Sequence, residues 1–150
     1  MRIVIQRVSS ASVESEGEIL GSIDRGLMIL LGIEEIDGME DVEWLCKKVV
    51  DMRIFPDEEG RMNCSLKDAR GEALVISQFT LHASTKKGNR PSFIRAARAE
   101  HAIPLYDAFK AHLGGLLGFP VASGKFGADM QVSLCNDGPV TIVMDSRARE

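Results

Sequence analysis

Four residues that could do chemistry follow an apolar run near the middle of the chain. The run at residues 73–76 leads directly into Ser77, Gln78, Phe79 and Thr80. Hydroxyl and amide groups at a strand end can bind a ribose or an ester, and nearby backbone N–H groups can stabilise an oxyanion. If the segment stays extended, Gln78 and Thr80 share one face of the strand. The alternative is that these side chains only satisfy buried backbone groups.

A second candidate is the segment at 136–139, Asn-Asp-Gly-Pro, which two apolar runs flank. Because glycine and proline punctuate regular structure, the pattern predicts a turn between two strands. Proline also lowers the cost of a cis peptide bond to about 0.5–1 kcal/mol. A cis bond between Gly138 and Pro139 would present two backbone carbonyls to a ligand with no bulky side chain in the way. The segment is therefore either a plain turn or a ligand contact made by backbone.

Positive charge gathers in one segment of an otherwise acidic chain. The 150 residues carry a net charge of −4, and residues 85–98 carry +5, which leaves −9 for the remainder. A basic patch on an acidic body suits a protein that touches a polyanion at one place; the alternative is a solvated loop. The basic side chains are Lys86, Lys87, Arg90, Arg95 and Arg98.

Phe126 lies in a short segment flanked by Gly124 and Gly127. A ring in such a loop can stack on a nucleobase, although a core phenylalanine would show the same pattern. Met28, Met52 and Met130 are interpreted as core residues that fill space.

Several common sites are missing from the sequence. It contains no P-loop, no GxGxxG, no GxSxG and no HExxH motif. The histidines lack the spacing of metal ligands, so we expect no metal and no cofactor. Thr80 and His82 would share a face of an extended strand and could pair as nucleophile and base, but nothing in the sequence orients the imidazole. The histidines are His82, His101 and His112.

The length favours one domain, residues 1–150, with a substantial core. No run approaches the roughly 18 apolar residues of a membrane-spanning helix, and the first apolar stretch is too short for a signal peptide. Three cysteines without CxxC spacing are typical of reduced core thiols. We therefore expect a cytoplasmic protein without membrane contact.

The apolar pattern then predicts the elements that must position these residues. Helices are expected over 39–53, with Asp37 as its cap, and from Pro104 to Leu116, with Pro104 in the first turn. Residues 54–66 are turn-rich and predict an exposed hairpin or loop. Strands are expected at 2–13, 18–23, 27–33, 73–76, 120–122, 130–134 and 140–144. The sum is a single mixed domain of the α+β class with mostly strand-to-strand connections.

Four motifs together resemble the D-aminoacyl-tRNA deacylases. They are Ser-Gln-Phe-Thr-Leu at 77–81, Arg-Pro-Ser-Phe at 90–93, Gly-Lys-Phe-Gly-Ala-Asp-Met at 124–130 and Asn-Asp-Gly-Pro-Val-Thr at 136–141. Each motif is weak alone, but all four occur in the order of the family and in a chain of its length. The resemblance implies a deacylase-type fold with a mainly antiparallel, barrel-like sheet and two main helices.

The resemblance also implies a function and assigns roles. A homodimer would hydrolyse the ester between a D-amino acid and the terminal adenosine of tRNA, and would accept mischarged glycyl-tRNA. Residues 77–80 would line the pocket for the adenosine and ester. Gly138 and Pro139 would form a cis gate that reaches into the partner subunit and excludes L-amino acids. The acceptor end of tRNA would meet the basic segment and Phe126.

Three hypotheses follow for the chemistry. In the first, the ribose 2′-OH of the substrate assists a water and the protein positions the ester. In the second, Thr80 is the nucleophile of a hydrolase that acts on another ester. In the third, the protein is a non-catalytic tRNA-binding module built on the basic segment.

Overall fold

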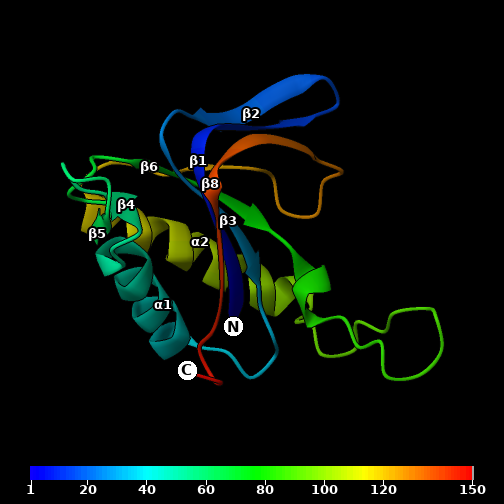
Figure 1. Ribbon diagram of the computed structural model, residues 1–150. Coiled ribbons are helices and arrows are strands. Elements are labelled where there is room, and N and C mark those ends of the chain that lie inside the picture. The colour runs from blue at the N-terminus through cyan, green and yellow to red at the C-terminus, as the bar shows by residue number, and fades with distance from the viewer. Residues whose placement is uncertain (150) are drawn as a thin grey trace.

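The computed structural model describes residues 1–149 and consists of one curled sheet with two helices packed against it (Figure 1). The first strand, β1 (Arg2–Ser15), is the one on which the sheet is assembled. Its side chains alternate, so that Ile3 and Ile5 are fully buried while Arg2 and Val4 are half-buried. That alternation places one face of β1 against the core.

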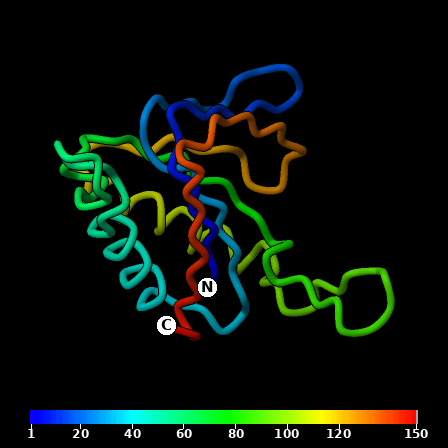
Figure 2. The backbone as a smooth tube through the Cα atoms, in the orientation of Figure 1, coloured from blue at the N-terminus to red at the C-terminus, as the bar shows by residue number. Residues whose placement is uncertain are grey.

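Three strands pair with β1 in antiparallel fashion. β3 (Gly26–Gly32) pairs with its first half and β2 (Glu18–Ile23) with its second half. β8 (Gln131–Asp145) covers its other edge from Arg2 to Glu14. Figure 2 shows β1 and β8 following each other through the molecule.

The two remaining strand pairs of the main sheet are parallel, and a helix connects the two strands of each pair. α1 (Met39–Asp51) lies between β3 and β6 (Glu72–Ser77), and α2 (Ala99–Leu117) lies between β6 and β7 (Ala122–Ser123). β6 is therefore an inner strand, paired with β3 on one side and β7 on the other. Between α1 and β6, β4 (Phe55–Pro56) and β5 (Met62–Cys64) form the small hairpin expected at 54–66.

The sheet curls until its two ends nearly meet. Gly21 of β2 lies so close to β7 that a Cβ atom added there would be 3.0 Å from the carbonyl oxygen of Ser123. A side chain at this position would require the backbone of β7 to shift by a few tenths of an ångström. The mixed α+β fold with a barrel-like sheet is confirmed, and the two parallel pairs are the part that the sequence pattern did not indicate.

The main core lies between the sheet and the helices. Leu45 and Val49 of α1 and Phe109 of α2 are fully buried against Ile3 and Ile5 of β1. Cys46 belongs to this core, and burial raises the pKa of its thiol to about 12. The prediction of core thiols fails for Cys135, which is exposed on β8. No helix within residues 1–149 is long and apolar enough to cross a membrane.

α1 begins at Met39 as predicted, but its capping residue differs from the prediction, and α2 begins earlier than predicted. Asp37 does not cap α1, because its buried carboxylate accepts a hydrogen bond from the terminal amino group of Met1 at 2.6 Å. Gly38 caps the helix instead, and the Asp41 carboxylate accepts the Gly38 N–H at 2.9 Å. α2 begins at Ala99, so that Pro104 lies inside it rather than in its first turn. Pro104 is tolerated there because it lies on the exposed face of the helix, where water can satisfy the carbonyl that loses its partner.

Candidate functional site

A pocket of about 260 Å³ lies where β6 ends. Ser77, Gln78 and Phe79 form one wall, and the end of β3 contributes Leu31 and Ile33. The segment that leads into β8 contributes Phe126 and Met130, and β8 itself contributes Val132. The pocket thus has polar groups at the strand end and an apolar lining elsewhere.

The chain leaves the sheet at Gln78, whose N–H donates the last ladder bond to the Leu31 carbonyl at 2.8 Å. It then forms one 3₁₀ turn, η1 (Phe79–His82), so the segment is not extended and its side chains do not alternate as predicted. The turn brings the Gln78 amide to the Thr80 hydroxyl, to which it donates at 2.5 Å. The first N–H groups of a helical turn have no partner inside it, so those of Phe79 and Thr80 are not bonded within η1.

The structure does not form the Thr80–His82 pair. His82 is 2% exposed, and neither of its ring nitrogens has a hydrogen-bond partner among residues 1–149. The imidazole points into the protein rather than toward the Thr80 hydroxyl because η1 rotates residues two apart onto different faces. Thr80 therefore has no base beside it.

Phe126 is positioned by α2. It is half-buried, with its ring centroid 5.9 Å from that of Tyr106, and the Tyr106 hydroxyl donates to the Val75 carbonyl of β6 at 2.8 Å. Burial raises the pKa of Tyr106 to about 12, so the hydroxyl stays a protonated donor at neutral pH. Phe126 thus packs on the core with one side and lines the pocket with the other, which combines the two interpretations that the sequence left open.

Met130 also has both roles. Its interpretation as a core residue holds, since it packs against a group of buried side chains that includes Val13 and Ile76. It lines the pocket as well. No pattern in the sequence distinguishes a methionine at a pocket from one in a core. A larger groove of about 930 Å³ lies between α1 and the end of β8, but it contains none of the predicted site residues.

The segment at 136–139 is not a turn between two strands. β8 runs through it as one strand, and the four residues 137–140 stand opposite Arg7 alone, between the pairs Gln6–Thr141 and Val8–Asn136. The segment is therefore a bulge, which pushes the chain out of the ladder. Its Gly138–Pro139 peptide bond is cis, and both residues are exposed.

Glycine is required at the centre of this bulge. Gly138 has a φ of +127°, which side chains rarely adopt, and an added Cβ would be 2.9 Å from Val140 Cγ2. Asn136 closes the bulge, since its side-chain oxygen accepts the Val140 N–H at 3.2 Å and its amide donates to the Thr141 hydroxyl at 3.3 Å.

Arg7 supports the bulge from beneath and was not among the residues predicted from the sequence. Its guanidinium donates to the carbonyls of Asp137 at 3.2 Å and Ile54 at 2.5 Å, and Nε lies 3.1 Å from the Asp137 carboxylate. Arg7 is only 8% exposed. A signal was present: Arg7 continues the inward-facing series of Ile3 and Ile5, where a charge needs a specific partner.

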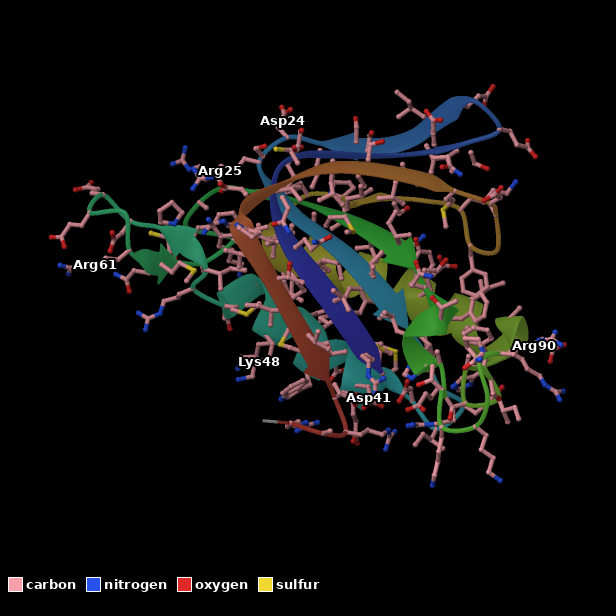
Figure 3. The ribbon with its side chains drawn as sticks, turned by 45° about the vertical axis from the view of Figure 1, so that its right-hand side comes forward. Asp24, Arg25, Asp41, Lys48, Arg61 and Arg90 are labelled. Carbon is pink, nitrogen blue, oxygen red and sulfur yellow. The ribbon has the colours of Figure 1, made fainter. Side chains whose placement is uncertain are left out.

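Three of the five basic residues lie on a loop that projects from the body of the molecule. Hydrogen bonds between Ser84 and Ser92, at 2.7 and 2.9 Å, close the base of this loop. Lys86, Lys87 and Arg90 are all exposed, and Figure 3 shows Arg90 pointing into solvent.

Not all of the predicted site residues meet within one chain. Ser77, Gln78, Phe79 and Phe126 line one pocket, and Thr80 is tied to it through Gln78. Gly138 and Pro139 do not line this pocket. Within residues 1–149, no three His, Cys, Asp or Glu side chains gather as a metal site would need.

Comparisons with known proteins give one consistent result. The family model described as "D-Tyr-tRNA(Tyr) deacylase" matches residues 4–145. Proteins named D-aminoacyl-tRNA deacylase from Akkermansia muciniphila and Bacteroides thetaiotaomicron are 64% and 61% identical to this chain, over the full length of both chains.

Two solved structures are similar as well. One, of a protein named "c-Myc DNA Unwinding Element Binding Protein", has a TM-score of 0.90 at 40% identity and covers 97% of this chain and 98% of its own. A probable eukaryotic D-amino acid tRNA deacylase has the same fold, with a TM-score of 0.83 at 17% identity, and covers 95% of this chain and 97% of its own. Because the family model spans almost the whole sequence, the chain belongs to the D-Tyr-tRNA(Tyr) deacylase family.

Proposed function

We propose that this protein is a D-aminoacyl-tRNA deacylase, which hydrolyses the ester between a D-amino acid and the terminal adenosine of tRNA. The observation that carries the proposal is the pocket at the end of β6, in a chain of this family. Ser77, Gln78 and Phe79 line this pocket together with Phe126, and its volume is about 260 Å³. Hydroxyl and amide groups suit a ribose and an ester, and an aromatic ring suits an adenine.

The attack on the ester uses a water that the 2′-OH of the terminal ribose assists. Thr80 lacks a neighbouring base, and its hydroxyl already accepts a hydrogen bond from Gln78. An unactivated hydroxyl is a weak nucleophile, so the side chains position the ester rather than attack it. The N–H groups at the start of η1 are available to the developing oxyanion.

Selection against L-amino acids comes from the bulge of a second subunit in a homodimer. Gly138 and Pro139 are exposed, and the edge of β8 away from β1 pairs with no strand among residues 1–149. Two backbone carbonyls on a bulge held by Arg7 would bind the amino group of the substrate and leave no space for an L side chain. Such a gate accepts glycyl-tRNA, because glycine has no side chain to exclude. An interaction difference of about 4 kcal/mol gives roughly thousandfold discrimination.

The acceptor end of tRNA reaches the projecting loop. Lys86, Lys87 and Arg90 are exposed there and would contact phosphates, which position the substrate without reading its sequence. This substrate places the enzyme in the cytoplasm.

One assay tests the proposal. The purified protein should release D-tyrosine from D-Tyr-tRNA and glycine from Gly-tRNA, and it should spare L-Tyr-tRNA. Equal rates on the D and L substrates would disprove the chirality of the reaction. Replacing the 2′-OH of the terminal ribose with hydrogen should abolish turnover.

The two alternatives make different predictions. If Thr80 is a nucleophile, Thr80→Ala abolishes turnover and the 2′-deoxy substrate is still cleaved. If the protein only binds nucleic acid, the property for which the 40%-identical relative is named, it binds tRNA in a salt-sensitive way without deacylation. In that case Lys86→Ala with Arg90→Ala removes the whole activity.

A further inference from the structure

A buried carboxylate contacts both the end of η1 and the segment that follows the projecting loop. Glu34 follows β3 and is 5% exposed. Its Oε1 atom lies 2.7 Å from Nη2 of Arg95, which comes from the segment between the loop and α2. The same oxygen lies 3.5 Å from Nδ1 of His82, the last residue of η1. One carboxylate therefore faces two cationic or potentially cationic groups from two separate segments.

His82 depends on Glu34 for its polar contact. Both ring nitrogens are buried, and neither has a hydrogen-bond partner among residues 1–149. A buried polar atom without a partner is costly, and the Glu34 carboxylate is the ionic partner that the structure gives the imidazole. The Glu34 carboxylate thus lies beside the last residue of η1.

The base of the loop is fixed by the same neighbourhood. The Ala97 N–H donates to the carbonyl of Ile33 at 2.8 Å, next to Glu34. The rings of Phe79 and Phe93 meet edge to face with centroids 5.1 Å apart, which brings the pocket segment against the loop. The lysines at the tip of the loop, Lys86 and Lys87, take no part in these contacts. A change at the tip therefore reaches the pocket through the base of the loop.

We propose that Glu34 is a positioning residue that couples the tRNA-contacting loop to the ester-binding segment. Through Arg95 it holds the segment that follows the loop, and through His82 it holds η1, whose first residue, Phe79, lines the pocket. Binding of tRNA phosphates to the loop then favours the geometry of η1 in which the ester is held for attack. This coupling rests on the proposed deacylase function and adds to it a reason why a full tRNA is a better substrate than its last nucleotide.

Two substrates separate the coupling from simple binding. D-Tyr-tRNA reaches the loop, whereas 3′-(D-tyrosyl)adenosine fills the pocket alone. Single-turnover rates at saturating enzyme report the chemical step for each substrate. For the unmodified protein we expect the tRNA ester to react faster, by about three- to tenfold. If it cleaves neither D ester, the proposed function fails; equal rates on both esters overturn the coupling alone.

Variants of the ion pair then locate the coupling. Glu34→Gln keeps the shape of the side chain, and Arg95→Met removes the guanidinium that faces the carboxylate while keeping an unbranched side chain. Each should lower the ratio of the two rates to about one, and the double variant should lower it no further. Glu35→Gln is the matched control, because its amide oxygen still accepts the Arg98 N–H that Glu35 binds at 2.8 Å.

The outcomes are distinct. A Glu34→Gln protein that slows equally on both substrates has only lost a structural contact, which overturns the proposal. An Arg95→Met protein with an unchanged ratio overturns it too, and so does a loss of the ratio in Glu35→Gln. Thermal unfolding of each variant shows that the compared proteins are folded.

Discussion

The pocket segment and the bulge are built in opposite ways. Residues 77–80 run from the last residue of β6 into η1. β6 is an inner strand whose residues 73–76 are buried between β3 and β7. Gly138 and Pro139 lie on the edge strand β8, exposed and opposite one residue of β1. The buried strand that precedes it positions the first region, whereas a few hydrogen bonds from Arg7 and Asn136 position the second.

The geometry of the two regions is therefore maintained by different kinds of interaction. Many small contacts hold the pocket, so the loss of one side chain should weaken it gradually. A few directional bonds hold the bulge, and their loss leaves buried groups unpaired. The predicted effects below run from the bulge, where single changes should be severe, to contacts that should matter little.

The largest effect is expected from Gly138→Ala. The new Cβ would be 2.9 Å from Val140 Cγ2 at a φ of +127°, so the bulge must move. We expect a loss of D-Tyr-tRNA deacylation of at least about 100-fold and a stability loss of about 1–3 kcal/mol. Gly60→Ala is the control, since its φ is also positive, at +78°, but an added Cβ meets nothing within 4 Å. Near-normal activity in Gly138→Ala would mean that the bulge is no more sensitive than the pocket.

Arg7→Met tests the support beneath the bulge. It leaves the carbonyls of Asp137 and Ile54 without their donor. We expect the free energy of unfolding in urea to fall by about 2–4 kcal/mol, together with weaker discrimination between D- and L-Tyr-tRNA. Arg53→Met, which removes an exposed contact to Asn63, should cost less than about 0.5 kcal/mol. Equal effects from both arginines would contradict this account.

Phe126→Ala tests the pocket side of the contrast. It removes the aromatic wall and the contact with Tyr106, while the other lining residues stay in place. We expect kcat/KM for D-Tyr-tRNA to fall by about tenfold, as for the loss of one stacking partner. Phe119→Ala changes a ring that is 39% exposed and lies outside this pocket, and it should leave kcat/KM unchanged. A Phe126 effect as large as that of Gly138→Ala would show that the pocket is as sensitive as the gate.

Asp145→Asn should have the smallest effect, and it should depend on pH. Burial alone would raise the pKa of Asp145, but hydrogen bonds from Arg147 N–H and Arg2 outweigh it and hold the pKa below 3.8. The carboxylate therefore stabilises the fold by about 1 kcal/mol at any pH above 3.8, its pKa in the unfolded chain. This contribution is lost as the pH falls through the lower pKa of the folded protein. Urea unfolding at pH 7 and in acid measures it. The Asn variant should be less stable at pH 7 and should approach the parent protein below pH 3.8.

Local patterns were sufficient to predict most of the fold. The alternation around Ile3 and Ile5 and the apolar run at 27–33 each depend on side chains that must be buried, which the sequence displays directly. The start of α2 was missed because Pro104 is a signal for a first turn, and only tertiary burial tells that it lies on an exposed face. The 3₁₀ turn after Ser77 was missed because hydroxyl and amide residues suit several local structures.

The candidate site could be predicted only in part, because local patterns do not show which distant residues meet. Ser77, Gln78, Phe79 and Phe126 were each singled out from the sequence, and the four line one pocket. The prediction of a turn at the bulge, residues 137–140, is wrong because glycine and proline mark both structures and only the pairing of β8 with β1 separates them. Arg7 is far from the bulge in sequence, and contacts between distant residues cannot be read from composition or spacing.

The pairing of β1 with β8 has a consequence for synthesis. β1 is made early, and the strand that covers its long edge follows every other element of the fold. Until β8 emerges from the ribosome, that edge presents unpaired N–H and C=O groups to other nascent chains, which makes it an aggregation hazard. Arg7 meets Asp137 only when β8 arrives. Protection of the nascent chain and assembly of the bulge are therefore completed in the same step.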